Sequence, residues 1–328
     1  MDAQLFGRDI ERTPHTMREL AASLRESNPW PELLSGSFQP GDGRRLVLLG
    51  MGSSHFANAV LALRLQAAGI NAIAVLASAD PLPRVDAADF VIAVSASGGS
   101  AETLHAIGQY SGRCSTIAVT NTSGSAIEAA CNAHVSMLAQ KEEGGVACRS
   151  FAHTLGLHLA LLESLVGGVD ASSLIRFAAD AVEDLLARRD EWVGPMSELL
   201  LGPDGTAIVA PARRLSSAQQ SALMLREGPR LPAIACETGD WSHIDVYLTK
   251  TTDYRMLLLP GSVWEPQLLD WCTQRGSTVV ALGAEVPGAA YALRYAGDDQ
   301  NDVRLLSEAV VCEVIAQQRW ASMGEGRG

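Results

Sequence analysis

Two short stretches rich in serine and glycine carry the residue types that can hold a small anion. GMGSSH follows the apolar run RRLVLL, SASGGS follows DFVIAV, and each precedes a helical pattern. Serine hydroxyls donate hydrogen bonds without adding charge, and glycine lets the backbone approach a ligand closely. A helix N-terminus adds unpaired N–H groups and a partial positive charge, which together suit a phosphate. The candidate phosphate-binding residues are Gly52, Ser53, Ser54, Ser95, Ser97, Gly98 and Ser100.

Two other interpretations of these loops stay open. Serines before helices often serve only as N-caps, and glycines often only form turns. A dinucleotide site is the other alternative, but His55 stands where a G-x-G-x-x-G motif needs its third glycine. No acidic residue follows NAIAVLAS at the position that would bind a ribose. The sequence therefore favours a phosphate over a nicotinamide dinucleotide and predicts no cofactor.

Alternating apolar runs and helical patterns place both loops at the ends of strands. Short apolar runs separated by amphipathic helices are typical of a parallel sheet covered on both faces, and ligands bind at the carboxyl ends of its strands. We predict strands at 44–50, 70–78, 88–94 and 115–121, with helices at 55–69, 100–112 and 153–168. The pattern then repeats, with strands at 205–210, 231–238, 253–260 and 277–284, and helices at 216–228, 265–276 and 305–323.

The repeated order of elements indicates a tandem duplication. We expect a helical N-terminal arm at 1–40, with helical spacing from Ile10 to Leu24 and then a loop rich in proline and glycine. A first α/β domain is predicted at 41–170, a connecting helix at 171–195 and a second α/β domain at 196–328.

The composition excludes several classes of partner. The chain has 328 residues, of which 47% are hydrophobic, and a net charge of −12, so neither nucleic acid nor an anionic membrane is expected as the main partner. No apolar run reaches the ~18 residues of a membrane span, and the charged N-terminus lacks the apolar core of a signal peptide. Six scattered cysteines predict reduced thiols in a cytoplasmic protein. The histidines are too dispersed to form a metal site.

The stretch VLLGMGSSHFANAV, followed by DFVIAVSASGGSAETLHAI, resembles the sugar isomerase (SIS) domain. The tandem form and the RDIERTP start resemble the isomerase half of glucosamine-6-phosphate synthase and related phosphosugar isomerases and deglycases, over about residues 5–320. The resemblance implies two tandem SIS domains, each a three-layer α/β/α sandwich with a parallel, flavodoxin-like sheet. It also implies that the hydroxyls of Ser54, Ser95, Ser97 and Ser100 contact the phosphate of a sugar phosphate.

This chain departs from the synthase pattern in both halves. Ala96 and Gly99 replace a glutamine and a glutamate, so we expect different contacts to the rest of the sugar. PARRLSS and PGSVWEP, the second half's counterparts of the two serine loops, do not resemble a phosphate cradle. We therefore expect one sugar site per chain.

Aldose–ketose interconversion needs a base that moves a proton between adjacent carbons and a group that opens the sugar ring. The resemblance assigns the base to Glu227 in LMLRE and the ring-opening group to His243, sixteen residues later in TGDWSH. Taken alone, Glu227 could be a solvated carboxylate at a helix end, and His243 an ordinary loop histidine. In a partly dry pocket the pKa of Glu227 should rise. The resemblance also implies a homodimer in which His243 reaches the active site of the partner subunit.

Three more residues are expected near the sugar. Gln220 stands where the synthase has another active-site glutamate, so that role is altered or lost. GGVACRS resembles the family's GVAS segment, which implies that Val146 and Cys148 line the pocket, with Cys148 in place of a serine. A nucleophilic role for Cys148 is the alternative, although no base can be assigned to it.

The leading hypothesis is an isomerase, deaminase or deglycase that enolises a phosphorylated sugar or amino sugar. The alternative is a non-catalytic sugar-phosphate sensor. The pair of Glu227 and His243 favours the enzyme, whereas Gln220 and the absence of any lysine after Lys250 favour the sensor. No stretch resembles a glutamine amidotransferase, so we expect that this chain alone does not make glucosamine phosphate from glutamine.

Overall fold

The computed structural model describes residues 1–34 and 43–325. The chain divides into two compact units, and each groups segments that are distant in sequence. The first-sheet unit comprises His15–Lys141 and Arg149–Arg176. The second-sheet unit comprises Met1–Pro14, Glu142–Cys148 and the chain from Phe177 onward. The boundaries predicted along the chain, at 40, 170 and 195, stay a prediction.

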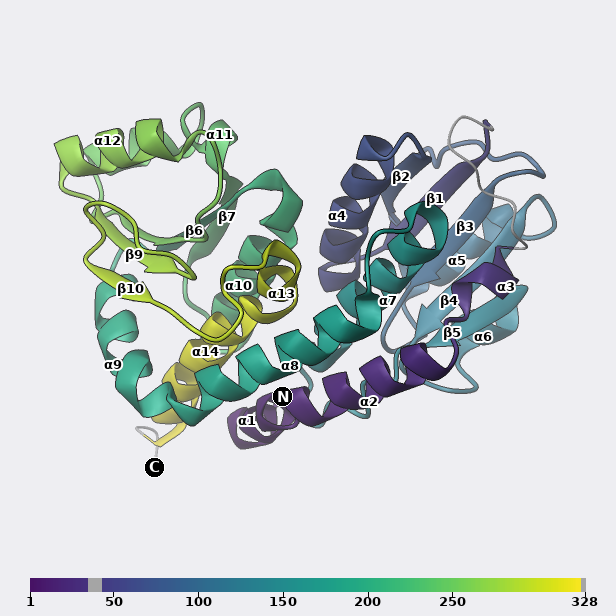
Figure 1. Cartoon of the computed structure of the whole chain (residues 1–328), viewed down its shortest axis with the longest axis horizontal. Helices are drawn as coiled ribbons and strands as arrows, with labels where there is room; N and C mark the ends of the chain where they lie inside the picture. The colour runs from purple at the N-terminus through teal and green to yellow at the C-terminus, as the bar shows by residue number, and fades with distance from the viewer. Residues whose placement is uncertain (35–42, 326–328) are drawn as a thin grey trace. The chain divides into compact units, whose positions relative to one another are not determined.

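The first-sheet unit is a parallel sheet with the strand order β2-β1-β3-β4-β5. The apolar runs form its central strands, and nearly every residue of β1, β3 and β4 is buried. The chain crosses from β1 to β2 on one side of the sheet and from β3 to β4 on the other, and the connecting helices cover its two faces. Helices α4 and α7 pack together (Figure 1), while α5 and α6 pack against Val47, Leu49 and Val91. The elements are α2 (Thr13–Glu26), α3 (Trp30–Leu33), β1 (Arg45–Gly50), α4 (Ser53–Ala67), β2 (Asn71–Leu76), β3 (Phe90–Val94), α5 (Ala101–Tyr110), β4 (Ser115–Thr120), α6 (Ala126–Ala130), β5 (Ala133–Ser136) and α7 (Arg149–Val166).

The second-sheet unit repeats this topology, with the strand order β7-β6-β8-β9-β10. Its core includes Trp241, Tyr254, Met256 and Leu268, and the Trp241 indole donates a hydrogen bond to the Tyr254 hydroxyl (2.8 Å). The elements are α1 (Ala3–Glu11), α8 (Ala171–Ala187, which begins in the first-sheet unit), α9 (Arg189–Leu200), β6 (Thr206–Ala210), η1 (Ala212–Arg214), α10 (Leu215–Glu227), β7 (Ala233–Glu237), α11 (Thr238–Trp241), η2 (Asp245–Lys250), β8 (Arg255–Leu258), α12 (Glu265–Arg275), β9 (Thr278–Leu282), β10 (Tyr291–Leu293), α13 (Asn301–Ser307) and α14 (Ala309–Glu325).

The predicted fold class is confirmed: two parallel five-stranded sheets form two α/β sandwiches that fit a tandem SIS arrangement. The prediction missed two short edge strands, β5 and β10, because three or four residues are too few to produce a clear apolar pattern. The single connecting helix is in fact two helices, α8 and α9, and the Trp192 indole donates a hydrogen bond to the Leu185 carbonyl across the break at Arg188 (2.9 Å).

Part of the predicted loop of the N-terminal arm, residues 35–42, lies outside the described residues. None of the described helices is long and apolar enough to span a membrane.

Candidate phosphosugar site

The two serine loops lie next to each other at the carboxyl edge of the first sheet. They follow β1 and β3, which are neighbouring parallel strands. The chain leaves β1 toward β2 on one side and leaves β3 toward β4 on the other, so the strand order reverses between these two loops. In open α/β sheets this reversal opens the crevice in which ligands bind. The fold therefore brings Gly52, Ser53 and Ser54 to the same edge as Ser95, Ser97, Gly98 and Ser100.

Helix α4 begins only three residues after the end of β1, so the loop between them is very short. A Cβ atom on Gly50 would lie 2.9 Å from the Ser54 Cβ and 3.0 Å from the backbone nitrogen of His55. Gly52 has a positive φ of 51° and caps α4 without any side-chain hydrogen bond. The first turn of α4, with Ser53 and Ser54, therefore begins directly at the strand end.

The loop after β3 is fastened through its carbonyl groups. The Ala96 carbonyl accepts hydrogen bonds from the Asn121 N–H (3.1 Å) and the Thr122 hydroxyl (3.2 Å). The Gly98 carbonyl accepts from the Ile127 N–H (3.1 Å), in α6. The N–H groups of Gly98 and Gly99 are also bonded within the loop, to the Ser95 carbonyl (3.0 Å) and the Ser97 hydroxyl (3.3 Å). What the loop can offer an anion is therefore mainly its serine hydroxyls, which can turn to donate.

Gly98 cannot be replaced without moving its neighbours. Its φ is +64°, and a Cβ atom here would lie only 2.3 Å from both Cβ and Oγ of Ser125. Ser125 is the N-cap of α6, and its buried hydroxyl has no partner among the described residues. The left-handed turn and the close approach both explain why a glycine stands between the serines.

Ser100 has a structural role as well as the predicted binding role. It is the N-cap of α5, where its hydroxyl oxygen accepts from the Thr103 N–H (3.3 Å). The same hydroxyl donates to the exposed Glu102 carboxylate (2.9 Å), and this bond contributes to the lowered pKa of Glu102 after the main cause, a backbone N–H bond. The N-cap interpretation thus holds for Ser100, and an internal carboxylate stands beside the place predicted for the phosphate.

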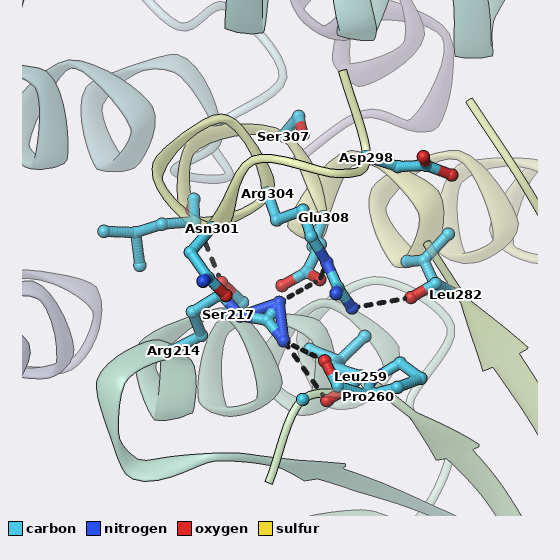
Figure 2. A network of polar contacts seen from close by, with 12 residues as sticks. Arg214, Ser217, Leu259, Pro260, Leu282, Asp298, Asn301, Arg304, Ser307 and Glu308 are labelled. Carbon is cyan, nitrogen blue, oxygen red and sulfur yellow. Dashed lines mark hydrogen bonds and ion pairs between the residues drawn. The ribbon is translucent and has the colours of Figure 1, made fainter. Parts of the chain in front are cut away.

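In the second sheet, side chains fill the corresponding reversal point, between β6 and β8 (Figure 2). Arg214 is fully buried and donates to the carbonyls of Leu259 and Pro260 and to the Glu308 carboxylate (2.7 Å). Arg304 donates to the same Glu308 oxygen (2.8 Å). Burial lowers the pKa of Arg214 to about 10, so the guanidinium still carries its charge at neutral pH.

An internal carboxylate also occupies the loop after β8, the counterpart of SASGGS. The Glu265 side chain accepts hydrogen bonds from the N–H groups of Gly261 and Ser262, which precede α12. An anion that the loop could otherwise bind is thereby replaced by the protein's own carboxylate. Both observations support the expectation of a single phosphate site per chain.

Glu227 lies at the end of α10, half-buried in the second-sheet unit. Burial is the main cause that raises the pKa of its carboxyl, and the nearby negative charge of Glu142 raises it further, against the opposing charge of Arg230. The direction agrees with the sequence-based expectation. A carboxyl with a raised pKa can exchange protons more readily near neutral pH.

Gln220 and the segment Glu142–Cys148 lie together with Glu227 in the second-sheet unit. Gln220 is fully buried two turns before Glu227 on α10, and its amide donates to the Ala147 carbonyl (2.8 Å). Val146 and Cys148 are also buried. The structure thus groups four of the predicted site residues: Val146, Cys148, Gln220 and Glu227.

His243 is not near Glu227 within the same chain. Glu227 ends the helix that leads down to the start of β7, whereas the exposed His243 follows α11 beyond the carboxyl end of β7. The five residues of β7 therefore separate the two levels by about 16 Å, at about 3.3 Å per residue. One chain by itself cannot bring the two side chains into contact.

Sequence reasoning missed Glu142 and Glu313 in the second-sheet unit and Ser125 in the first-sheet unit. Glu142 stands two residues before the recognised GGVAC segment, and that position was the available signal. Glu313 is a single charge in the apolar pattern VVCEVIA, which also could have marked it. Ser125 gave no signal, because only the folded loop brings it to Gly98.

Two of the seven histidines, His153 and His158, are buried in the interior of the first-sheet unit. The buried His153 ring contacts the Met137 carbonyl (2.7 Å) and the Thr16 hydroxyl (3.0 Å), and burial lowers its pKa to about 4. Burial also lowers the pKa of His158, to about 3, and that of the half-buried His55 beside the first serine loop.

The first sheet and both serine loops lie in a part of the chain that matches a known domain family. The family model of the SIS domain matches residues 42–165, so the chain contains a SIS domain, and the resemblance drawn from the sequence is confirmed. The chain is 23% identical over 314 residues to the glutamine–fructose-6-phosphate aminotransferase (isomerizing) of Sulfurisphaera tokodaii, with 94% of this chain and 52% of the relative covered. The enzyme of the same name from Aeropyrum pernix is 26% identical over 268 residues, with 75% and 43% covered. The chain thus spans about half the length of the curated relatives it matches.

Solved structures share the fold over nearly the whole chain. The C-terminal domain of glucosamine-fructose-6-phosphate aminotransferase from Francisella tularensis superposes with a TM-score of 0.78 and 15% identity, covering 97% of this chain and 96% of that one. Tagatose-6-phosphate ketose/aldose isomerase from Escherichia coli gives 0.78 and 17%, with 98% and 93% covered. Glucosamine-6-phosphate deaminase from Thermotoga maritima gives 0.74 and 15%, with 98% and 95% covered.

Proposed function

We propose that this protein is an enzyme that enolises a phosphorylated sugar or amino sugar, as an aldose–ketose isomerase or as a deaminase or deglycase. The observation that carries the proposal is the pair of donor-rich loops at the strand-order reversal of the first sheet. The filled reversal point of the second sheet supports it by contrast. The isomerase and deaminase activities named for proteins of the same fold fit this class of reaction.

In this proposal the substrate's phosphate binds between the two serine loops. The hydroxyls of Ser54, Ser95, Ser97 and Ser100 donate to its oxygens, and the backbone at Gly52, Ser53 and Gly98 allows the close approach. To bind phosphate, the Ser100 hydroxyl must leave the Glu102 carboxylate that it now contacts. Val146, Cys148 and Gln220 line the sugar.

Glu227 is the proposed base. It takes the proton from the carbon beside the open-chain carbonyl, which yields an enediol, and returns that proton to the neighbouring carbon while the hydroxyl proton moves from one oxygen to the other. A deaminase or deglycase starts from the same proton abstraction and releases its amine in a later hydrolysis by water. His243 would open the ring by moving a proton between the ring oxygen and the anomeric hydroxyl.

We further propose a homodimer with composite sites. The separation of about 16 Å along β7 means that His243 cannot serve Glu227 of its own chain. A His243 contributed by the partner subunit removes this obstacle. Mixing inactive Glu227→Gln chains with inactive His243→Asn chains should restore part of the activity, because some mixed sites receive both native groups. Mixed dimers without any recovery would argue against shared sites.

The decisive measurement is exchange of the substrate's C2 proton with deuterated water. A panel of hexose phosphates and aminohexose phosphates is incubated with the protein and analysed by mass spectrometry. Glu227→Gln should abolish the exchange while sugar-phosphate binding changes only a few-fold, whereas Glu198→Gln, at an exposed site on α9, should leave both unchanged. Exchange that persists in Glu227→Gln would remove Glu227 from its role.

The second candidate function is a sugar-phosphate sensor. The observation that favours it is Gln220, a neutral and fully buried amide that holds the Ala147 carbonyl instead of offering an ionisable group. A solved structure of the same fold is named a sugar binding protein, from Salmonella typhimurium (TM-score 0.73, 16% identity). Tight binding of a sugar phosphate without any proton exchange would support the sensor over the enzyme.

A further inference from the structure

Three glutamates from distant parts of the chain come close together in the second-sheet unit. Glu227 ends α10, Glu142 lies in the segment Glu142–Cys148, and Glu313 lies on α14. The negative charge of Glu142 raises the pKa of both other carboxyls, after burial as the main cause. Glu142 is therefore the member that is near both others. The three do not form a metal site, since no group of three potential ligands in residues 1–34 and 43–325 is close enough to hold an ion.

The backbone around Glu142 is held from two sides. On one side, the Asp9 carboxylate accepts from the Gly144 N–H (2.7 Å), and the Gly144 carbonyl accepts from the Asp2 N–H (3.1 Å). A Cβ atom on Gly144 would lie 2.5 Å from the Phe6 Cα, so α1 packs directly on this backbone. On the other side, the Gln220 amide binds the Ala147 carbonyl (2.8 Å).

The Glu142 side chain is fixed as well. One of its oxygens accepts a hydrogen bond from the Cys148 N–H (2.7 Å), which closes the segment into a compact loop. The loop therefore presents a negative charge from a defined position.

The other charges around Glu227 do not duplicate this effect. Arg230 acts in the opposite direction. Glu313 is 4% exposed, and its burial raises the pKa of its carboxyl to about 8, so it is mostly neutral at pH 7. Gln220, fully buried with its amide oxygen unpartnered among the described residues, carries no charge. Among the described residues, Glu142 is thus the negative charge that acts on Glu227.

We propose that Glu142 is a positioning residue whose fixed negative charge strengthens Glu227 as a base, an inference that rests on the proposed function of Glu227. Helix α1 and Gln220 contribute by holding the loop that carries Glu142. The N-terminal helix thereby gains a role in the site, although it contributes no group to the substrate.

The first test measures Glu227 directly and needs no substrate. Carbon-13 labelling of glutamate carboxyls allows an NMR titration of the whole protein, and the signal missing in Glu227→Gln identifies Glu227. Glu142→Gln should shift the titration of Glu227 to lower pH, whereas Glu142→Asp, which keeps the charge, should retain most of the native value. Glu143→Gln, at the exposed neighbouring position, is the matched control and should change nothing. An unchanged Glu227 titration in Glu142→Gln would overturn the proposal.

Glu313→Gln separates Glu142 from the rest of the cluster. Because Glu313 is mostly neutral at pH 7 and glutamine has the same shape, this variant should leave the Glu227 titration in place. A shift as large as that of Glu142→Gln would show that the charge acts from Glu313, and would overturn the proposal.

The second test connects the titration to chemistry. Where proton exchange from a sugar phosphate is observed, the acidic limb of its pH profile should move to lower pH in Glu142→Gln and stay in place in Glu143→Gln. A general structural defect would lower the rate at every pH without moving the limb. If no sugar phosphate exchanges a proton, the proposed enzyme fails, while the NMR titration still tests the action of Glu142 on Glu227.

Discussion

Replacing Gly98 by alanine should destabilise the first-sheet unit and weaken phosphate binding. Two separate costs arise in the structure. The left-handed backbone at φ +64° costs about 1–2 kcal/mol with a Cβ atom present. The contact of 2.3 Å with Ser125 adds about 1–3 kcal/mol, because Ser125 caps α6 and the loop and helix must move apart. The expected loss in the free energy of unfolding is about 2–5 kcal/mol.

Gly99 provides the matched control for this prediction. It is the next residue, has no positive φ, and a Cβ atom there would meet nothing within 4 Å. Gly99→Ala should therefore change the free energy of unfolding by no more than about 0.5 kcal/mol, as is usual for surface substitutions. The assay is urea denaturation, with hydrogen exchange of residues 90–110 to assign the change to this loop.

A double substitution separates the two costs. Ser125→Gly removes the atoms that the new methyl group would meet, and a glycine N-cap by itself costs only a few tenths of a kcal/mol. Gly98→Ala combined with Ser125→Gly should recover the contact cost of about 1–3 kcal/mol and keep the backbone cost. Equal stabilities of Gly98→Ala and Gly99→Ala, or no recovery in the double variant, would refute the reasoning.

Four further outcomes are expected. Ser97→Asp places a negative charge before α5, where the phosphate should bind, so calorimetry should show lost sugar-phosphate binding while circular dichroism stays native. Glu102→Gln removes the negative charge beside the Ser100 hydroxyl, so the affinity for inorganic phosphate should rise, most clearly at low salt; an unchanged affinity would place the phosphate elsewhere. The pKa of Glu313 rises to about 8 on folding, so between about pH 5 and pH 8 the folded protein binds more protons than the unfolded chain. The folded protein therefore loses stability as the pH rises toward about 8. Glu313→Gln should remove this loss, as measured by urea denaturation between about pH 5 and pH 9. Arg214→Met leaves Glu308 short of one of its two buried partners and should cost about 3–5 kcal/mol, whereas adding Glu308→Met should recover part of that loss in the same assay.

The sequence by itself determined the architecture and the candidate phosphate site. The apolar runs are continuous because the central strands are buried on both faces, and this local signal is strong enough to give the parallel sheets and the duplication. The serine and glycine loops are also local signals, since a loop between a parallel strand and its helix lies at the carboxyl edge wherever the strand sits. The raised pKa of Glu227 was predictable in direction from its apolar helical turn.

Only the tertiary structure decided what surrounds these residues. The strands β5 and β10 exist because each pairs with a neighbour, not because three or four residues favour an extended form by themselves. PARRLSS gave no sign that Arg214 would be buried against Glu308 and two carbonyls, where it fills the reversal point of the second sheet. Likewise, α1, α10 and α14 contribute Asp9, Gln220 and Glu313 to the region of Glu142. The physical reason is that burial and charge–charge interaction depend on distance in space, and folding brings together residues that no sequence pattern relates.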